Sequence, residues 1–443
     1  MLTLNLRRFQ ACLAITTFLF GITPRFAGAQ TTNPVFADSA DALPAVWTDT
    51  KFHLSHAYPT TIPSDPKSWK NFDFATQPKQ YIQAVIDYCL EGNIDAAGEF
   101  TIDGNTVRTW YHAPGMAAGA SGREFIHGLT KERGINLHDL DPSTTTNPSI
   151  QSWAIGFYNP IGAVTLGNVW ADPDNPDASK AKFEDGAVTF KLLFTTATAT
   201  QLTFLNGAPE WKANIHRNLD HVTTPPPTVR LLQVDIAVRD TRADSTTGWV
   251  FGTFEYRDNP SEPNVWKRLV PVGLMWGNDP TLLTQADVTA AGGLKETWLN
   301  KPDLVLPHYG YLDRLNGPVD NPASSCLSCH ATAANPQGNL VPKTNSSTEI
   351  QKFFQNIKAG NTSGTGDALD YSLQLSVGMR NFPGTAMAAA PHALMALPSA
   401  QSSPGDAVLR DGTIDLDAEA QRLIEYRRHR AATQPANRPP PSR

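Results

Sequence analysis

The hydrophobic pattern near the start of the chain has the period of a helix. Over residues 78–91 an apolar side chain recurs every third or fourth position on one face, and Gly92 follows as a C-terminal cap. We therefore predict a helix over 78–91. Cys89 lies on its apolar face, which favours a small core residue over a reactive thiol.

Further along, the pattern changes to that of strands. Short runs rich in Val, Ile, Phe, Trp and Thr are separated by turn clusters, with no helical pattern between most of them. These runs are 152–158, 163–169, 187–194, 229–239, 248–256 and 266–276. In 248–256 both alternating sets contain apolar or aromatic residues, so both faces of that strand are predicted to be at least half buried. The pattern is typical of an antiparallel sandwich or barrel.

The regions on either side of the predicted strands differ from them. Residues 30–75 are rich in Pro, Thr, Ser and Asp and read as extended loop, and residues 278–320 read as a connector. Residues 321–430 are mostly of helical pattern, and 431–443 form a proline-rich tail. We predict a multidomain protein. A β-rich domain over 30–300, with an N-terminal helical and loop region, precedes an all-α domain over 321–430.

The first 29 residues have the pattern of a secretory signal peptide. Arg7 and Arg8 precede the apolar run 11–22, and Ala27-Gly28-Ala29 is a small-residue cleavage site. The alternative is an uncleaved membrane anchor, which the short apolar run disfavours. We expect export to the periplasm and no transmembrane segment after cleavage.

Charge and cysteine content exclude two other classes of protein. The formal net charge is −6, and the sequence has only a short basic run at 427–430, so a nucleic-acid partner is not expected. Four cysteines in 443 residues are too few for a disulfide scaffold.

Cys326, Cys329 and His330 form the one strong chemical motif, C-x-x-C-H. This spacing is that of a c-type haem attachment, in which both thiols bond to the haem vinyl groups and the histidine binds the iron. Asn321 as N-cap, followed by proline, predicts a helix over 322–334. The three side chains would then lie on one face at i, i+3 and i+4.

Two other uses of a close cysteine pair fit less well. A thioredoxin-like site requires a βαβ unit around the pair, and a zinc site requires further Cys or His at finger-like spacing; neither pattern is present. A sixth iron ligand is predicted at Met379, which lies in a segment containing Gly and Pro. The alternatives are Met387, Met395, His392, His308 or an open site.

With this motif and a downstream methionine, residues 321–430 resemble a bacterial class I-type cytochrome c domain. The resemblance implies an all-α haem domain with one covalent haem c. It also implies Cys326 and Cys329 as covalent anchors, His330 as proximal ligand and Met379 as distal ligand.

The predicted function is single-electron transfer between periplasmic donor and acceptor proteins, without catalysis, because no second redox motif is visible. The alternative is a haem-containing oxidoreductase or peroxidase-like enzyme whose β domain binds the substrate. A gas sensor with a weak sixth ligand is the third reading.

Overall fold

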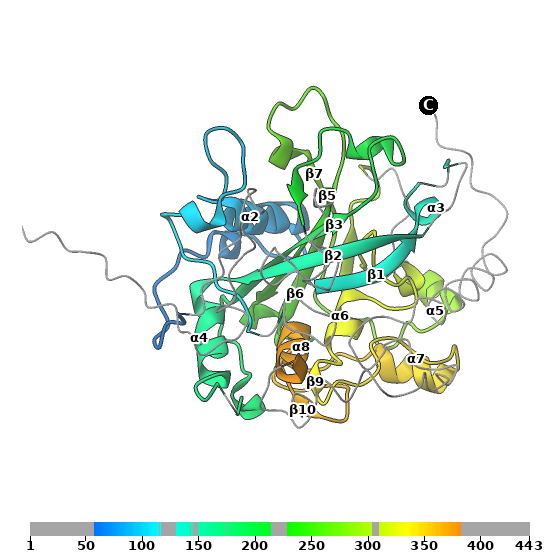
Figure 1. Cartoon of the computed structure of the whole chain (residues 1–443). Coiled ribbons are helices and arrows are strands. Elements are labelled where there is room, and N and C mark those ends of the chain that lie inside the picture. The colour runs from blue at the N-terminus through cyan, green and yellow to red at the C-terminus, as the bar shows by residue number, and fades with distance from the viewer. Residues whose placement is uncertain are drawn as a thin grey trace, which may run out of the picture. The chain divides into compact units, whose positions relative to one another are not determined.

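The computed structural model describes residues 57–381, except 115, 117–129, 142, 145–148, 174, 214–227 and 304–309. All of them belong to one compact unit, residues 32–443. Within the described part, eight strands form a curled antiparallel sheet, half of a barrel, in the order β1-β2-β3-β5-β6-β7-β8, with β4 paired to β5 (Figure 1). The signal peptide and the tail predicted from the sequence lie outside the described residues.

The strands of this sheet are β1 (Thr130–Asn136), β2 (Ser149–Tyr158), β3 (Val188–Thr195), β4 (Glu210–Lys212), β5 (Thr228–Arg239), β6 (Trp249–Tyr256), β7 (Leu269–Met275) and β8 (Thr297–Leu299). A separate two-stranded ladder pairs β9 (Ala334–Asn335) with β10 (Asp367–Ala368). The α-helices are α2 (Pro78–Leu90), α3 (Leu137–Leu140), α4 (Pro160–Val169), α5 (Gln285–Ala290), α6 (Cys326–His330), α7 (Ser347–Phe353) and α8 (Leu373–Asn381). Short 3-10 turns are η1 (Ser68–Asn71), η2 (Ile102–Gly104), η3 (Ala178–Lys180), η4 (Thr203–Leu205), η6 (Thr241–Ala243), η7 (Val265–Arg268) and η8 (Tyr311–Asp313).

One face of the sheet, here called the α2 face, carries the larger apolar core. Residues in register across its strands form the row Phe157, Phe190, Ile236, Gly252 and Leu274. Helix α2, predicted from the sequence, packs here with its apolar side chains buried. Cys89 is a fully buried core residue, as predicted. A Cβ at Gly252 would lie 2.8 Å from the Ile82 side chain of α2, so a glycine is needed for this close approach.

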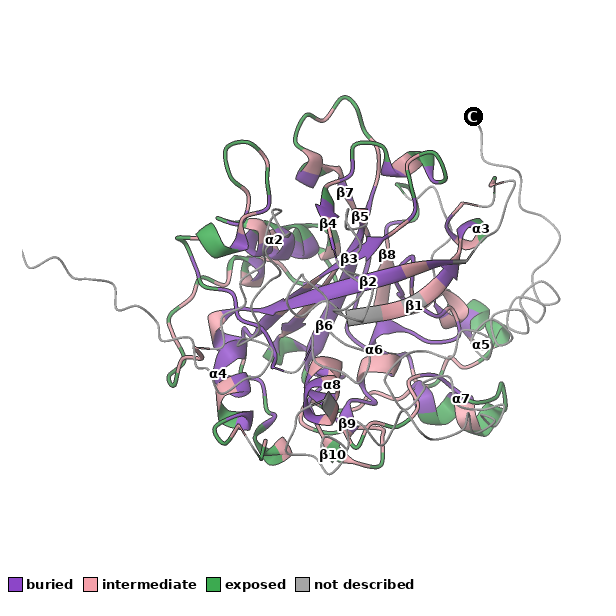
Figure 2. Ribbon diagram, in the orientation of Figure 1, coloured by how far each residue is buried: buried purple, intermediate pink, exposed green. Residues whose placement is uncertain are grey.

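The opposite face, here called the motif face, is covered by α6, α8 and the loops between them. Its central row, one residue out of step with the first, is Gly156, Lys191, Asp235, Thr253 and Gly273. Successive side chains of a strand point to opposite faces, so the two rows face different layers. Every residue of β6 is buried, which confirms the prediction that both of its faces are covered (Figure 2).

Two structural predictions are wrong. Residues 163–169 belong to helix α4 rather than to a strand: Asn159 caps the helix by accepting a hydrogen bond from the Gly162 amide, and Pro160 occupies its first turn. The predicted fold class, with an all-α domain over 321–430, is also wrong. In the described part of that segment the helices are short, and α6 and α8 pack against the sheet instead of against one another in a bundle. The predicted last helix, near 416–424, lies outside the described residues.

Candidate functional site

The C-x-x-C-H motif is the whole of helix α6. Ser325, not Asn321, is its N-cap: the Ser325 hydroxyl accepts from the Ser328 amide, and the Ser328 hydroxyl accepts from the Ser325 amide. This reciprocal pair is a capping box, and it delays the helix start to Cys326. Asn321 instead closes a turn by accepting from the Ala323 amide. The predicted helix over 322–334 is therefore shorter, but it still carries both cysteines and His330 on consecutive turns.

His330 is held by a backbone carbonyl and an aromatic ring. Its Nδ1 lies 2.8 Å from the carbonyl oxygen of Tyr371, just before α8. Its ring lies 4.7 Å, centroid to centroid, from that of Phe251 on β6. Burial lowers the pKa of His330 to about 4, so the imidazole is neutral at neutral pH. A neutral imidazole with Nδ1–H donated to a carbonyl presents Nε2 as its metal-binding nitrogen.

The carbonyl that contacts His330 belongs to a strained turn. Asp370 has φ of 45° and Tyr371 has φ of 67°, two consecutive non-glycine residues in the left-handed region. Such residues cost on the order of 1–3 kcal/mol each and persist only where surrounding contacts hold them. The strained backbone at Tyr371 therefore supplies the carbonyl oxygen that orients His330.

The two motif thiols are free of a disulfide. Cys326 is buried, and its Sγ lies 3.7 Å from Oδ1 of Asn316. Burial, and then the carboxylates of Asp320 and Asp235, raise the pKa of the Cys326 thiol well above its ordinary value. Cys329 is half-buried. Two thiols that form no disulfide and one neutral imidazole on one helix match the donor set of a covalent haem, so the residues present fit that group.

A polar cluster on the motif face lies beneath α6. Lys191 Nζ on β3 lies 3.5 Å from Oδ2 of Asp235 on β5. Asp235 Oδ1 accepts from the Thr253 hydroxyl at 2.8 Å and from the Gln233 amide at 2.7 Å. The Gln233 amide also approaches Asp320, which precedes the motif, at 3.4 Å. We call Lys191, Gln233, Asp235, Thr253 and Asp320 the polar cluster.

The charges of the polar cluster shift its pKa values. Burial lowers the pKa of Lys191. The negative charges of Glu132, Asp235, Asp320 and Cys329 raise this pKa by more than burial lowers it, so the net shift is upward. Burial raises the pKa of Asp235 to about 6, with Asp320 adding to the rise and Lys191 opposing it. The cluster therefore holds a stable cation beside a carboxyl that titrates close to neutral pH.

Met379 lies in α8, not on a loop, and its side chain is fully buried. It belongs to the same apolar cluster as Cys326 and Leu327. Its role as a sixth iron ligand stays a prediction. The alternative ligands His308, Met387, His392 and Met395 lie outside the described residues.

Sequence reasoning missed the polar cluster and the Asp370–Tyr371 turn. The cluster had a signal: Lys191 and Asp235 are charged residues near the centres of two strand patterns, each with apolar neighbours on both sides in the sequence. Buried charges of this kind require partners. The Asp370–Tyr371 turn had no such signal, because glycine or asparagine usually marks left-handed backbone and neither occurs there.

Comparison of the chain with family models, curated proteins and solved structures finds no match. In the part of the chain that the structure describes, no helix is long and apolar enough to cross a membrane. No group of three or more His, Cys, Asp or Glu that could hold a metal ion is found among the same residues.

Proposed function

We propose that this chain is an exported c-type haem protein. One haem is attached through Cys326 and Cys329, with His330 as its proximal ligand. The observation that carries the proposal is the Nδ1 contact of His330 with the Tyr371 carbonyl. His330 shares helix α6 with two cysteines that form no disulfide. That contact is the usual second partner of a metal-binding histidine, and it fixes the tautomer that exposes Nε2.

The chain's own residues would provide a largely dry environment on the motif face. Phe251 packs against the His330 ring, and Leu327 and Leu375 are fully buried beside it in the same apolar cluster. The bound group would supply a metal that accepts and releases one electron. Burial and hydrogen bonding of the axial ligand are the levers by which a protein sets the potential of such a group.

We propose single-electron transfer between periplasmic donor and acceptor proteins as the function. The signal-like pattern over 1–29 supports the location, because covalent haem attachment occurs on the oxidising side of the membrane. The test is the optical spectrum of protein exported from a host that has a cytochrome maturation system. Sharp reduced α and β bands are expected, and colourless, correctly processed protein would contradict the proposal.

Met379 completes this proposal as the sixth ligand, and one substitution tests it. Met379→Leu should remove the weak far-red band that His/Met ligation gives to the oxidised protein. Met275→Leu is a matched control, because Met275 is equally buried in the same apolar cluster but lies on β7. An unchanged spectrum in Met379→Leu would exclude Met379 as a ligand.

A haem-containing oxidoreductase is the second candidate, and the polar cluster favours it. An electron carrier has no need of a titrating carboxyl beside a buried lysine, whereas chemistry on a bound substrate needs groups that move protons. Lys191→Met and Asp235→Asn separate the two functions. Electron exchange with a small redox dye should survive both substitutions, whereas peroxide-dependent turnover, if present, should fall at least tenfold.

A further inference from the structure

The strained turn at Asp370 and Tyr371 is built by one carboxylate. Asp370 is 2% exposed, and its Oδ1 accepts from the Trp249 indole at 2.9 Å and from the Gly360 amide at 2.8 Å. Its Oδ2 accepts from the Phe183 amide at 2.7 Å. Three donors from three separate segments therefore converge on a side chain that directly precedes Tyr371.

We propose that Asp370 and Trp249 are positioning residues for His330. The Asp370 carboxylate and the Trp249 indole hold the left-handed turn that directs the Tyr371 carbonyl at Nδ1 of the imidazole. This inference rests on the proposed function, because the orientation of His330 matters most when its Nε2 binds iron.

Strand β6 makes the coupling direct. Trp249 and Phe251 are two residues apart on this strand, so both point to the motif face. Phe251 packs against the His330 ring, while Trp249 holds the turn that supplies its hydrogen-bond acceptor. One strand thus fixes the imidazole from its ring face and, through Asp370, from its Nδ1 edge.

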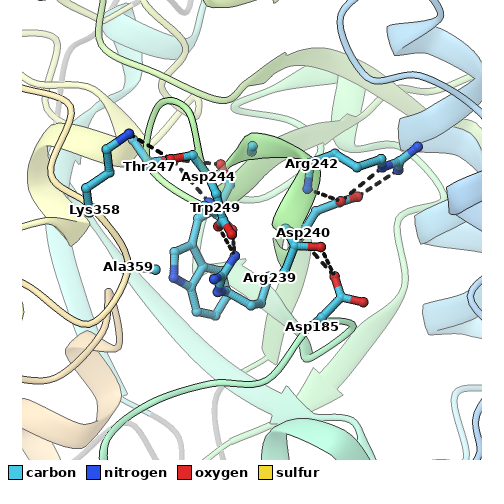
Figure 3. A network of polar contacts seen from close by, with 12 residues as sticks. Asp185, Arg239, Asp240, Arg242, Asp244, Thr247, Trp249, Lys358 and Ala359 are labelled. Carbon is cyan, nitrogen blue, oxygen red and sulfur yellow. Dashed lines mark hydrogen bonds and ion pairs between the residues drawn. The ribbon is translucent and has the colours of Figure 1, made fainter.

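The segment leading to the turn is fastened to the same region of the sheet. The Ala359 amide donates to the Thr247 carbonyl at 2.8 Å, and the Lys358 ammonium donates to the Asp244 carbonyl at 2.7 Å. Figure 3 shows Lys358, Ala359 and Trp249 together at the turn that joins β5 to β6. Gly360, the next residue, donates to Asp370. Residues 358–360, which precede the Asp370–Tyr371 turn, are therefore bound both to the β5–β6 connection and to Asp370.

The expected effect is on the electronic character of the iron ligand. A carbonyl that accepts from Nδ1–H makes the imidazole more electron-rich, which stabilises ferric iron. Trp249→Phe and Asp370→Asn should weaken that contact, so each should raise the midpoint potential of the haem and alter the reduced optical spectrum. Asp370→Asn keeps one acceptor oxygen and a residue that tolerates left-handed backbone, so the chain should still fold.

Matched controls distinguish positioning from general loosening. Trp266 is 4% exposed, and its indole donates to the Gly98 carbonyl at 2.9 Å in the core of the α2 face. Asp240 is a fully buried carboxylate of the same type, paired with Arg242. Trp266→Phe and Asp240→Asn should lower stability without moving the potential. Equal shifts in the variants and controls, or no shift in Trp249→Phe and Asp370→Asn, would overturn the inference.

A second readout does not require haem. In full-length chain made without the maturation system and labelled with [15N]histidine, His330 should be the Nδ1–H tautomer, its signal identified by loss in His330→Gln. Asp370→Asn should shift it toward the Nε2–H tautomer. If protein exported from the host with the maturation system is colourless while the haem-free chain shows this tautomer shift, the haem is refuted and the positioning role is kept. Haem-loaded protein with no effect of the variants would refute only the positioning role.

Discussion

Asp235 and Asp240 are both largely shielded from solvent in the region of β5, yet their pKa values are shifted in opposite directions. Burial raises the pKa of both carboxyls. At Asp240, hydrogen bonds and charge from Arg242 outweigh that effect, and the net pKa is lowered. At Asp235 the single nearby cation, Lys191, is outweighed by burial and by the charge of Asp320, and the pKa rises to about 6.

The surroundings of the two groups explain the difference. Asp240 accepts from Nε and Nη2 of Arg242, at 3.0 and 2.7 Å (Figure 3). It also accepts from the Tyr81 hydroxyl of α2 at 3.1 Å. Asp235 has a more distant cation, at 3.5 Å, on the face that carries the motif. A well-paired carboxylate is typical of a structural network, whereas a carboxyl held near its titration point is typical of a functional site.

The largest expected effect is on haem content, and it should differ between the cysteines of the motif face and the cysteine of the α2 face. Cys326→Ala with Cys329→Ala should abolish covalent haem, since neither thioether can form. Cys89→Ala removes a fully buried thiol from the core of the α2 face and should leave the haem content per folded molecule unchanged. Haem content is measured by the pyridine haemochrome spectrum. Loss of haem in Cys89→Ala would break the distinction between the faces.

Adjacent residues of β6 offer the next test, on stability. Phe254 is fully buried on the α2 face, and Phe254→Ala should lower the free energy of unfolding by about 3–5 kcal/mol. Thr253→Val on the motif face removes one hydrogen bond to Asp235 and should cost about 1 kcal/mol. Urea unfolding measures both. A larger loss in Thr253→Val would show that the polar cluster, not the apolar core, dominates stability.

Asp240→Asn should lower stability at neutral pH by about 2 kcal/mol, because the charge of Arg242 then faces a neutral amide. The folded pKa of Asp240 lies below 3.8, so its contribution is present above about pH 4 and is lost as the pH falls further. The variant should therefore lose less stability than the wild type on acidification. Parallel acid-unfolding curves would contradict this assignment.

Asp235→Asn should show the opposite dependence of stability on pH. The unfolded chain releases this proton near pH 3.8 and the folded chain near pH 6, so wild-type stability falls as the pH rises between those values. The variant should lack that fall, which amounts to about 3 kcal/mol at most, because the two pKa values differ by roughly two. Urea unfolding at pH values on both sides of the window measures the difference. A variant that tracks the wild type across the window would remove Asp235 as a titrating group.

Local sequence rules predicted the elements whose environment resembles their own pattern. Helix α2 has one apolar face and packs on one surface, so its period of 3.6 revealed it. Strand β6 has apolar or aromatic residues on both sides because both layers cover it. The prediction for helix α4 was wrong because this helix is buried on nearly all sides, so no polar face reveals its helical period.

The site was only half accessible from sequence. The motif itself is local, so the roles of its cysteines and histidine could be proposed from spacing alone. The surface beneath it depends on register between β3, β5 and β6, which brings Lys191, Asp235 and Thr253 into one row. The all-α prediction for 321–430 failed for a related reason. Helices α6 and α8 are short and gain their burial from the sheet, a partner that local periodicity cannot reveal.

The most direct test of the haem site is the mass of one peptide. Trypsin cuts after Arg314 and Lys343, so residues 315–343 are released as one fragment that contains the entire motif. In protein exported by a host with a maturation system, this fragment should carry the mass of one haem bound through Cys326 and Cys329. The bare peptide mass, in protein that is otherwise folded and processed, would contradict the account.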